Sequence, residues 1–283
     1  MENKMLVNWL FATKAFRVSP ENKPFWYTSG TIGPYYINTH FLYGSEEKAS
    51  DLLDKIDYCK NDKPVCPGIL SRMIRKNYEN DLIFKGLIDS MVDFIKSNVE
   101  LEKVEYISGG ERRDWFFSLI AAEILDKPHI TIFKDLTAVL TEKGNTMEMP
   151  QINGAQVLHI ADLITEASSY ERAWIPAVAS FGGNIAWSVV VVDRKQGGEE
   201  LLSKNGVKSF AMVSIDNSLF SEALEMGLVN QPQYQMLSDY SSNPKECMKK
   251  FLKEHPEFLE NSLKADVKTA ERARLCIEKK IYE

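Results

Sequence analysis

The sequence predicts an α/β fold in which helices cover both faces of a twisted, mostly parallel sheet. Between residues 104 and 215, apolar runs of strand length alternate with helical patterns. From residue 216 onward the patterns are all helical, which predicts a helical C-terminal extension. The chain has 283 residues, of which 44% are hydrophobic and 26% charged, and this balance is typical of a globular protein with a substantial core.

The expected elements follow the apolar patterns along the chain. A helical pattern over residues 4–16 ends at a proline-containing break, and aromatic residues predict a hairpin of strands at 25–30 and 35–42. A helix is expected at 46–58, and apolar residues three or four apart predict another from Leu82 to Ile95. The alternating part predicts strands at 104–108, 129–133, 156–160, 185–192 and 209–215, and helices at 114–125, 169–181 and 199–204.

A loop of about 19 residues, 135–153, separates two of these strands. Loops of this length in compact domains often act as lids over a site. The polar sequence is also compatible with an irregular surface excursion or with an extended hairpin, and the pattern does not decide between them.

The overall charge argues against a nucleic-acid partner. The formal net charge is −6 and the isoelectric point is about 5.5, whereas binding to nucleic-acid phosphates calls for a basic surface. No membrane partner is expected, because the longest apolar run, near Val189–Val192, is far shorter than a membrane span. The first residues lack the apolar core of a signal peptide, so we expect a cytoplasmic protein.

The cysteines and histidines do not predict a metal site. Four cysteines are too few and too scattered for a disulfide framework: Cys59, Cys66, Cys247 and Cys276. Cys59 and Cys66 lie seven positions apart without a second pair at zinc-ligand spacing, so free or structural thiols are expected. His40, His129 and His159 fall on or beside expected strands, where a hydrogen-bonded core role is more common than metal ligation.

Two neighbouring strands end in polar residues. The strand at 156–160 is followed by Asp162, Thr165, Ser168 and Ser169, and a helix then begins at once. This order directs hydroxyls and backbone N–H groups to one point past a strand end, where α/β proteins hold phosphates. The next strand also ends in a charged turn. Two such ends, one crossover apart, predict a single site at the edge of the sheet.

Three motifs resemble a known enzyme family. Residues 157–169 (VLHIADLITEASS) are similar to the phosphoribosyl-pyrophosphate-binding motif of type I phosphoribosyltransferases. Residues 27–38 (YTSGTIGPYYIN) resemble the N-terminal signature of orotate phosphoribosyltransferases, and residues 193–198 (DRKQGG) resemble the Asp-Arg-x-x-Gly-Gly turn of that family. The motifs occur in the family's order and together span about residues 20–215.

The resemblance implies a fold and a reaction. The expected fold is a type I phosphoribosyltransferase-like domain over residues 1–215, with a small hood within 1–60, and a helical extension over 216–283 packed on it. The family binds phosphoribosyl pyrophosphate with Mg²⁺ and joins C1 of the ribose to a pyrimidine nitrogen, with release of pyrophosphate. Its members are typically homodimers in which a mobile loop reaches the neighbour's site.

The resemblance also assigns the site residues. The ribose 5-phosphate is expected at five residues of the main motif: Asp162, Thr165, Ala167, Ser168 and Ser169. Pyrophosphate and Mg²⁺ are expected near Arg112 and Arg113, and Lys134 and Lys143 are the candidate catalytic cations of the long loop. Tyr36 and Arg194 are expected to border the base, and Ser29 is a further expected substrate-binding residue.

Several positions depart from the family pattern and leave a second interpretation open. One acid of the family's pair is missing, because Ala161 precedes Asp162, and Glu166 and Ala167 stand in the phosphate loop. Thr28 replaces a lysine, and the long loop lacks the family's run of basic residues. These changes remove positive charge that stabilises a departing pyrophosphate. The alternative is a catalytically inactive protein of this fold that binds a nucleotide or phosphosugar in a regulatory role.

Overall fold

A computed structural model describes residues 2–282, which form two compact units. The first, here the sheet unit, comprises the chain up to Lys14 and Thr39–Ile215. The second, here the hood–tail unit, comprises Ala15–Asn38 and the chain from Asp216 onward. Residues 15–38 therefore group with the C-terminal helices. That residues 1–215 and 216–283 form separate domains stays a prediction.

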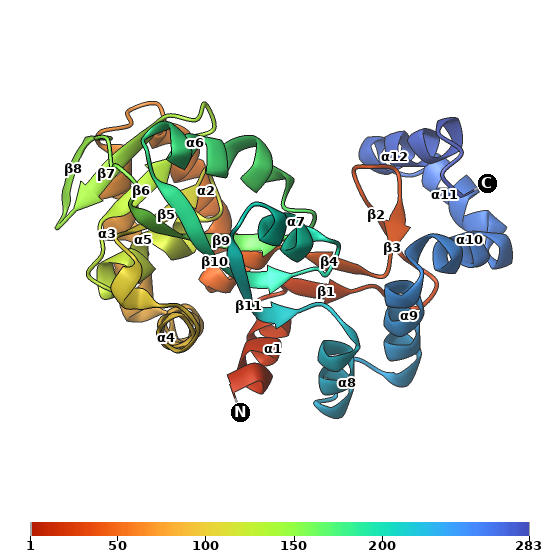
Figure 1. The fold of residues 1–283 in the computed structure, drawn as a ribbon. Helices are drawn as coiled ribbons and strands as arrows, with labels where there is room; N and C mark the ends of the chain where they lie inside the picture. Colours follow the sequence, from red (N-terminus) through yellow and green to blue (C-terminus); the bar gives the residue numbers. More distant parts are fainter. Residues whose placement is uncertain (1, 283) are drawn as a thin grey trace. The chain divides into compact units, whose positions relative to one another are not determined.

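The sheet unit contains a seven-stranded sheet in the order β11-β10-β9-β5-β6-β7-β8 (Figure 1). Neighbouring strands from β11 to β6 run parallel, and β7 and β8 are antiparallel additions at one edge. The α/β fold with a mostly parallel sheet is thus confirmed. The strands are β5 (Tyr106–Gly110), β6 (His129–Ile132), β7 (Ala138–Glu142), β8 (Asn145–Glu148), β9 (Gln156–Ile164), β10 (Asn184–Asp193) and β11 (Lys208–Ser214).

The long loop at 135–153 contains the hairpin β7–β8, so the hairpin alternative is confirmed. Lys143 and Gly144 form its two-residue turn with φ angles of 46° and 80°. Positive φ at both positions is typical of a type I′ turn, whose twist matches that of the two strands.

Both faces of the sheet are covered. Val157 and Ala161 of β9 belong to a core cluster that includes side chains of α6 and α7, whereas Leu158 and Ile160 between them are equally buried. Because successive side chains of a strand point to opposite faces, a second layer covers the other side. Helix α5 packs on β5 and β9, α6 on β10 and α7 on β11. Their bounds are α5 (Trp115–Ile124), α6 (Ile175–Ser180) and α7 (Gly198–Lys204).

The N-terminal helices of the sheet unit include one that was not expected, α3. The bounds are α1 (Glu2–Ala12), the 3-10 helix η1 (Thr39–Tyr43), α2 (Glu46–Cys59), α3 (Cys66–Asn80), α4 (Leu82–Asn98) and the 3-10 helix η2 (Leu101–Lys103). Pro67 and Gly68 read as a turn signal. In the structure they occupy the first turn of α3, where proline is well tolerated.

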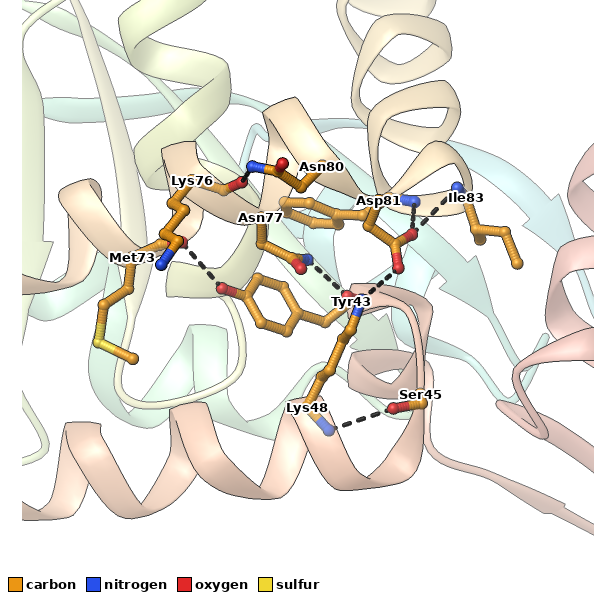
Figure 2. A network of polar contacts seen from close by, with 10 residues as sticks. Tyr43, Ser45, Lys48, Met73, Lys76, Asn77, Asn80, Asp81 and Ile83 are labelled. Carbon is orange, nitrogen blue, oxygen red and sulfur yellow. Dashed lines mark hydrogen bonds and ion pairs between the residues drawn. The ribbon is translucent and has the colours of Figure 1, made fainter.

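A network of polar contacts joins α2, α3 and α4 (Figure 2). Asp81 caps α4 by accepting hydrogen bonds from the N–H groups of Ile83 and Phe84, and its other oxygen pairs with Lys48 at 2.7 Å. Asn77 of α3 donates through Nδ2 to the carbonyl of Tyr43 at 2.6 Å. Capping and cross-helix bonds therefore fix the layer of helices that carries α2.

The hood–tail unit pairs short strands differently from the expectation. β2 pairs with β3, and β1 pairs with β4, so the predicted hairpin between 25–30 and 35–42 is wrong. These strands are β1 (Phe16–Val18), β2 (Phe25–Trp26), β3 (Ile32–Gly33) and β4 (Tyr35–Ile37). The helices of the unit are α8 (Asn217–Glu225), α9 (Gln231–Ser242), α10 (Pro244–Glu254), α11 (Pro256–Leu263) and α12 (Val267–Glu278).

Trp26 joins the two sequence segments of the hood–tail unit. Its indole N–H donates to the Ser262 hydroxyl at 2.9 Å, and its ring stacks on Phe258 with centroids 5.7 Å apart. Arg272 donates to the Trp26 carbonyl at 3.0 Å. The aromatic hood segment therefore buries its side chains against C-terminal helices.

Among the helices formed by residues 2–282, none combines the length and the apolar character needed to cross a bilayer.

Candidate functional site

Three loops meet at the carboxyl edge of the parallel strands β5, β9 and β10. The N–H of Arg194 donates to the carbonyl of Ile164 at 2.9 Å, and the N–H of Gly198 donates to the carbonyl of Thr165 at 3.1 Å. Because neighbouring parallel strands end at the same edge, the polar turns after them lie side by side. The predicted convergence of two polar strand ends is therefore present, and the loop after β5 joins them.

A cavity of about 370 Å³ lies at this edge and is lined by residues 111–114, residues 161–170 and Trp174. It brings together most of the predicted phosphosugar residues: Arg112, Arg113, Asp162, Thr165, Ala167, Ser168 and Ser169. Polar and charged groups from two loops thus surround a volume of the size of a small ligand.

A buried pair of carboxylates forms part of the cavity wall. Asp162 lies within β9, two residues before its end, and is only 9% exposed. One oxygen of Asp114 accepts a hydrogen bond from the N–H of Asp162 at 3.0 Å, and the other accepts one from the N–H of Gly110 at 3.1 Å. Oδ2 of Asp162 has no hydrogen-bond partner among the described residues. This oxygen is buried and keeps an unused capacity to accept a hydrogen bond.

The pair is electrostatically coupled. Burial is the main cause that raises the pKa of Asp162 to about 7, and the nearby carboxylate of Asp114 raises it further. The positive charge of Arg113 acts in the opposite direction. Asp114 was not among the predicted site residues, because it lies in a charged run, Glu111–Asp114, and comes from a different loop. Asp114 therefore places a second acid beside Asp162, whereas the preceding residue, Ala161, carries no carboxylate.

Buried polar side chains near the cavity are held by hydrogen bonds and ring contacts. His159 lies 2.9 Å from the Ser108 hydroxyl, and Tyr170 bonds to Ser188 at 2.6 Å. His159 also stacks on Trp174, with ring centroids 6.1 Å apart. His129 bonds to Ser118 and Thr131, so both histidines have the predicted hydrogen-bonded core role. His40 is buried as well, and burial together with the charges of Arg113 and Arg112 lowers its pKa to about 3.

The loop after β9 carries one residue in an uncommon backbone conformation. Ala167 has a φ of 53°, in the left-handed region that favours glycine, and its side chain is buried. Glu166 is exposed and lines the cavity. The helix that follows begins with a π-helical turn, η3 (Tyr170–Trp174), and continues as α6. The expected strand–loop–helix unit is therefore present.

A further cation lies beside this loop. The guanidinium of Arg172 donates to the hydroxyl and to the carbonyl of Ser168, both at 3.2 Å. Sequence reasoning missed Arg172, although its position four residues after Ser168 places it one helical turn away. It provides a positive charge bonded to Ser168, one of the hydroxyl residues of the loop.

The two arginines after β5 have different surroundings. Arg112 forms an ion pair with Asp57 of α2, and Lys60 of the same helix end pairs with Glu111 at 3.3 Å. The peptide bond between Glu111 and Arg112 is cis. Arg113 influences the pKa of both Asp162 and His40 and therefore lies near the acid pair. Of the two, Arg113 is the cation associated with the buried carboxylates.

The remaining predicted residues lie outside the cavity wall. Lys134 donates through its backbone N–H to the Glu111 carboxylate at 3.0 Å, and Lys143 lines a separate cavity of about 760 Å³. Arg194 donates through its backbone N–H to the carbonyl of Ile164, the last residue of β9. Ser29 and Tyr36 belong to the hood–tail unit, where Ser29 bonds to Thr31 and Tyr36 packs against Phe25 and Tyr27.

Comparisons with known proteins point in one direction. No protein-family model matches the chain. An orotate phosphoribosyltransferase from Sulfolobus acidocaldarius is 25% identical over 168 residues, which cover 59% of this chain and 80% of that protein.

Solved structures show the same architecture. The orotate phosphoribosyltransferase of Francisella tularensis aligns with a TM-score of 0.54 at 15% identity, covering 84% of this chain and 98% of the other. The UMP synthase of Leishmania donovani aligns with a TM-score of 0.55 at 16% identity, covering 84% of this chain and 42% of the other. The type I phosphoribosyltransferase fold and the similarity to orotate phosphoribosyltransferases are thus confirmed.

Proposed function

We propose that this orotate phosphoribosyltransferase-like protein transfers ribose 5-phosphate from phosphoribosyl pyrophosphate to a pyrimidine-like base and releases pyrophosphate. The observation that carries the proposal is the cavity at the carboxyl edge of the sheet. Hydroxyl residues of one loop, the carboxylates of Asp114 and Asp162, and Arg113 all line it. A phosphosugar diphosphate presents the complementary groups, namely phosphates for donors and cations, and hydroxyls for carboxylates.

In this proposal the loop at 165–169 holds the 5-phosphate. Thr165, Ser168 and Ser169 provide hydroxyl donors, and the loop backbone provides N–H donors. Arg172, which is already bonded to Ser168, offsets the charge of Glu166. The ribose hydroxyls donate hydrogen bonds to the carboxylates of Asp162 and Asp114, which supply the two acids that the phosphosugar needs.

The pyrophosphate lies toward Arg113 and Arg112 in the proposed complex. The reaction breaks the bond between C1 and the pyrophosphate oxygen and forms the bond between C1 and the base nitrogen. Stabilising the negative charge on the departing oxygens is the main electrostatic task, and preorganised cations perform it. Lys134 is the proposed loop cation. The expectation for Lys143 is wrong, because the β7–β8 turn lies beside the start of β6, at the opposite edge of the sheet. Tyr36 and Arg194 are the proposed neighbours of the base, and Ser29 is a further proposed substrate-binding residue. No side chain is required as a general base.

Magnesium fits this site as an ion bound through the substrate. The described residues contain no group of three or more histidine, cysteine or acidic side chains that could hold a metal. Mg²⁺ commonly uses one or two carboxylates together with substrate phosphates, and Asp114 and Asp162 are the aspartates that line the cavity. When bound, the ion neutralises charge on the pyrophosphate. We further propose that the protein is cytoplasmic and forms a homodimer. Light scattering on the purified protein tests the dimer.

The test is a titration followed by a turnover assay. Phosphoribosyl pyrophosphate with Mg²⁺ is titrated into the protein by calorimetry, and pyrophosphate release is then measured with a panel of pyrimidine bases. The proposal requires both binding and base-dependent release. A variant with Asp162→Asn and a variant with the exposed Asp93→Asn serve as active-site and surface comparisons.

A non-catalytic phosphosugar-binding protein is the second candidate. Glu166 and the ion pair of Arg112 with Asp57 favour it, because both reduce the positive character of the cavity. Ala167 favours it for a steric reason, because its side chain limits how closely the loop backbone approaches a phosphate. Binding without release over the whole base panel would support this candidate against the enzyme. Absence of binding would contradict both.

A further inference from the structure

Cys59 and Cys66 lie against each other at the turn between α2 and α3. Their Sγ atoms are 3.0 Å apart, and the two residues are 3% and 0% exposed. Cys59 is the last residue of α2 and Cys66 is the first of α3. All four cysteines of the chain are free thiols in the structure. The sequence spacing alone predicted separate thiols, whereas the turn brings these two into contact.

The surroundings of Cys66 favour its protonated thiol. Burial is the main cause that raises the pKa of the Cys66 thiol, with further contributions from Cys59 and from the carboxylates of Glu111 and Asp62. The short turn at 60–65 joins the two cysteines, and most of its residues are exposed. Exposed turns are among the segments that open locally most readily, and such opening gives a small oxidant access to the thiols.

The same turn contacts loops at the edge of the sheet. Lys60 pairs with Glu111, and Asp57 pairs with Arg112, so the end of α2 holds one wall of the candidate site. Lys63 forms an ion pair with Asp135. A covalent link across the turn would fix the segment that makes these contacts.

We propose that Cys59 and Cys66 form a reversible intramolecular disulfide by exchange with a low-molecular-weight disulfide such as oxidised glutathione. One cysteine loses its proton, and the thiolate attacks the glutathione disulfide, forming a mixed disulfide and releasing one glutathione thiolate. The other cysteine, deprotonated in turn, attacks the protein sulfur and releases the second glutathione. The protein loses two electrons and two protons, and one oxidised glutathione becomes two reduced glutathiones.

Oxidation of the folded full-length chain tests the site. The protein is incubated with oxidised glutathione at pH 7 and at pH 8.5, and remaining thiols are counted after alkylation and denaturation. Two of the four thiols should disappear, faster at the higher pH because the thiolate is the attacking species. Peptide mapping should find Cys59 linked to Cys66, and dithiothreitol should restore both thiols.

Matched variants keep this test decisive. The double variant Cys247→Ser/Cys276→Ser retains the pair and should lose both of its thiols, whereas Cys59→Ser should form no internal link. The oxidised protein should also melt several degrees above the reduced one, because the bond restricts the unfolded chain. Four persistent thiols, a stable glutathione adduct in place of the internal bond, or a lower melting temperature after oxidation would overturn the proposal. This test does not depend on phosphoribosyl transfer.

Discussion

At the scale of single residues, the site depends on a carboxyl group buried where an isolated charge is costly. Asp162 has one oxygen without a protein partner and lies next to Asp114. Burial and the neighbouring acid both favour its neutral form, so the proton on this group is part of the folded structure near neutral pH. Its titration therefore contributes to the pH dependence of stability.

We predict that Asp162→Asn removes this contribution. The pKa of Asp162 rises from its ordinary value of 3.8 to about 7, so the folded state binds the proton more tightly than the unfolded state. The contribution to the unfolding free energy is fully present below about pH 4 and is lost as pH rises to 7. Asparagine cannot ionise, so this loss is absent from the variant. The unfolding free energy of the variant should therefore rise relative to that of wild type over the interval, by up to about 1.4 kcal/mol per pH unit.

Urea unfolding of both proteins from pH 4.5 to 8 measures the difference. Subtracting the wild-type curve cancels the opposite trend of His40 and His129, whose lowered pKa values make stability increase as pH rises through the acid range. Asp93→Asn is the surface control, because Asp93 is largely exposed. A difference between Asp162→Asn and wild type that is constant over this pH interval would contradict the burial argument.

A second residue-scale prediction concerns Glu166. Its carboxylate lines the cavity and repels an anion there, so Glu166→Gln should strengthen the binding of inorganic phosphate about fivefold, or about 1 kcal/mol, at low salt. The gain should shrink at high salt, because exposed charges are screened. Glu171→Gln removes the same charge at an exposed position outside the cavity wall. If both variants bind phosphate equally well in calorimetry, the proposed repulsion between Glu166 and a phosphate in the cavity is contradicted.

The elements are the scale at which the sequence was most informative. Apolar runs predicted β5, β6, β9 and β10 because each is buried over most of its length, and β11 was also expected although only Val213 of it is buried. The polar residues after β9 line the cavity at the edge of the sheet, and their role in binding stays a prediction. Contacts between distant segments were not predictable. Asp114 reaches Asp162 only because β5 and β9 are neighbours in the sheet, and the small strands found partners that local alternation does not specify.

Gly198 shows how one position controls the distance between two elements. A Cβ there would lie 2.8 Å from the carbonyl oxygen of Thr165 and would also clash with Ile164. We predict that Gly198→Ala separates the turn from the phosphate loop, costs about 1–3 kcal/mol of stability and weakens phosphate binding. Gly68→Ala is the control, because a Cβ there meets no atom within 4 Å. Urea unfolding and phosphate titration should separate the variants, and equal stability would contradict the close approach.

The cap of α4 gives a prediction independent of the site. Asp81→Ala removes the acceptor for Ile83 and Phe84 and the partner of Lys48, so it should lower the unfolding free energy by about 1–2 kcal/mol. Asp93→Ala, whose exposed ion pair spans 3.8 Å, should change it by less than about 0.5 kcal/mol. Urea unfolding measures both losses. Similar losses in the two variants would show that the Asp81 cap contributes no more to the unfolding free energy than an exposed ion pair does.

At the scale of the whole molecule, the chain crosses between its two units more than once. Residues 15–38 leave the sheet unit, contact the C-terminal helices, and are followed by the rest of the sheet unit. The sequence predicted both the hood and the helical extension but not that these two segments share a core. Their shared contacts join residues more than two hundred positions apart, such as Trp26 and Ser262, and no local pattern records such a distance.

This arrangement predicts the result of shortening the chain. A chain ending at residue 215 keeps Trp26 and Phe16 but loses their partners Phe258 and Phe220, so aromatic surface buried in the hood–tail unit becomes exposed. We expect the shortened chain to bind the dye ANS strongly and to aggregate in size-exclusion chromatography, whereas the full chain does neither. The full-length variant Ser262→Ala is the matched control, because it removes one hydrogen bond to Trp26 and keeps the aromatic contacts. A shortened chain that stays monodisperse and binds no dye would show that residues 15–38 do not need the C-terminal helices.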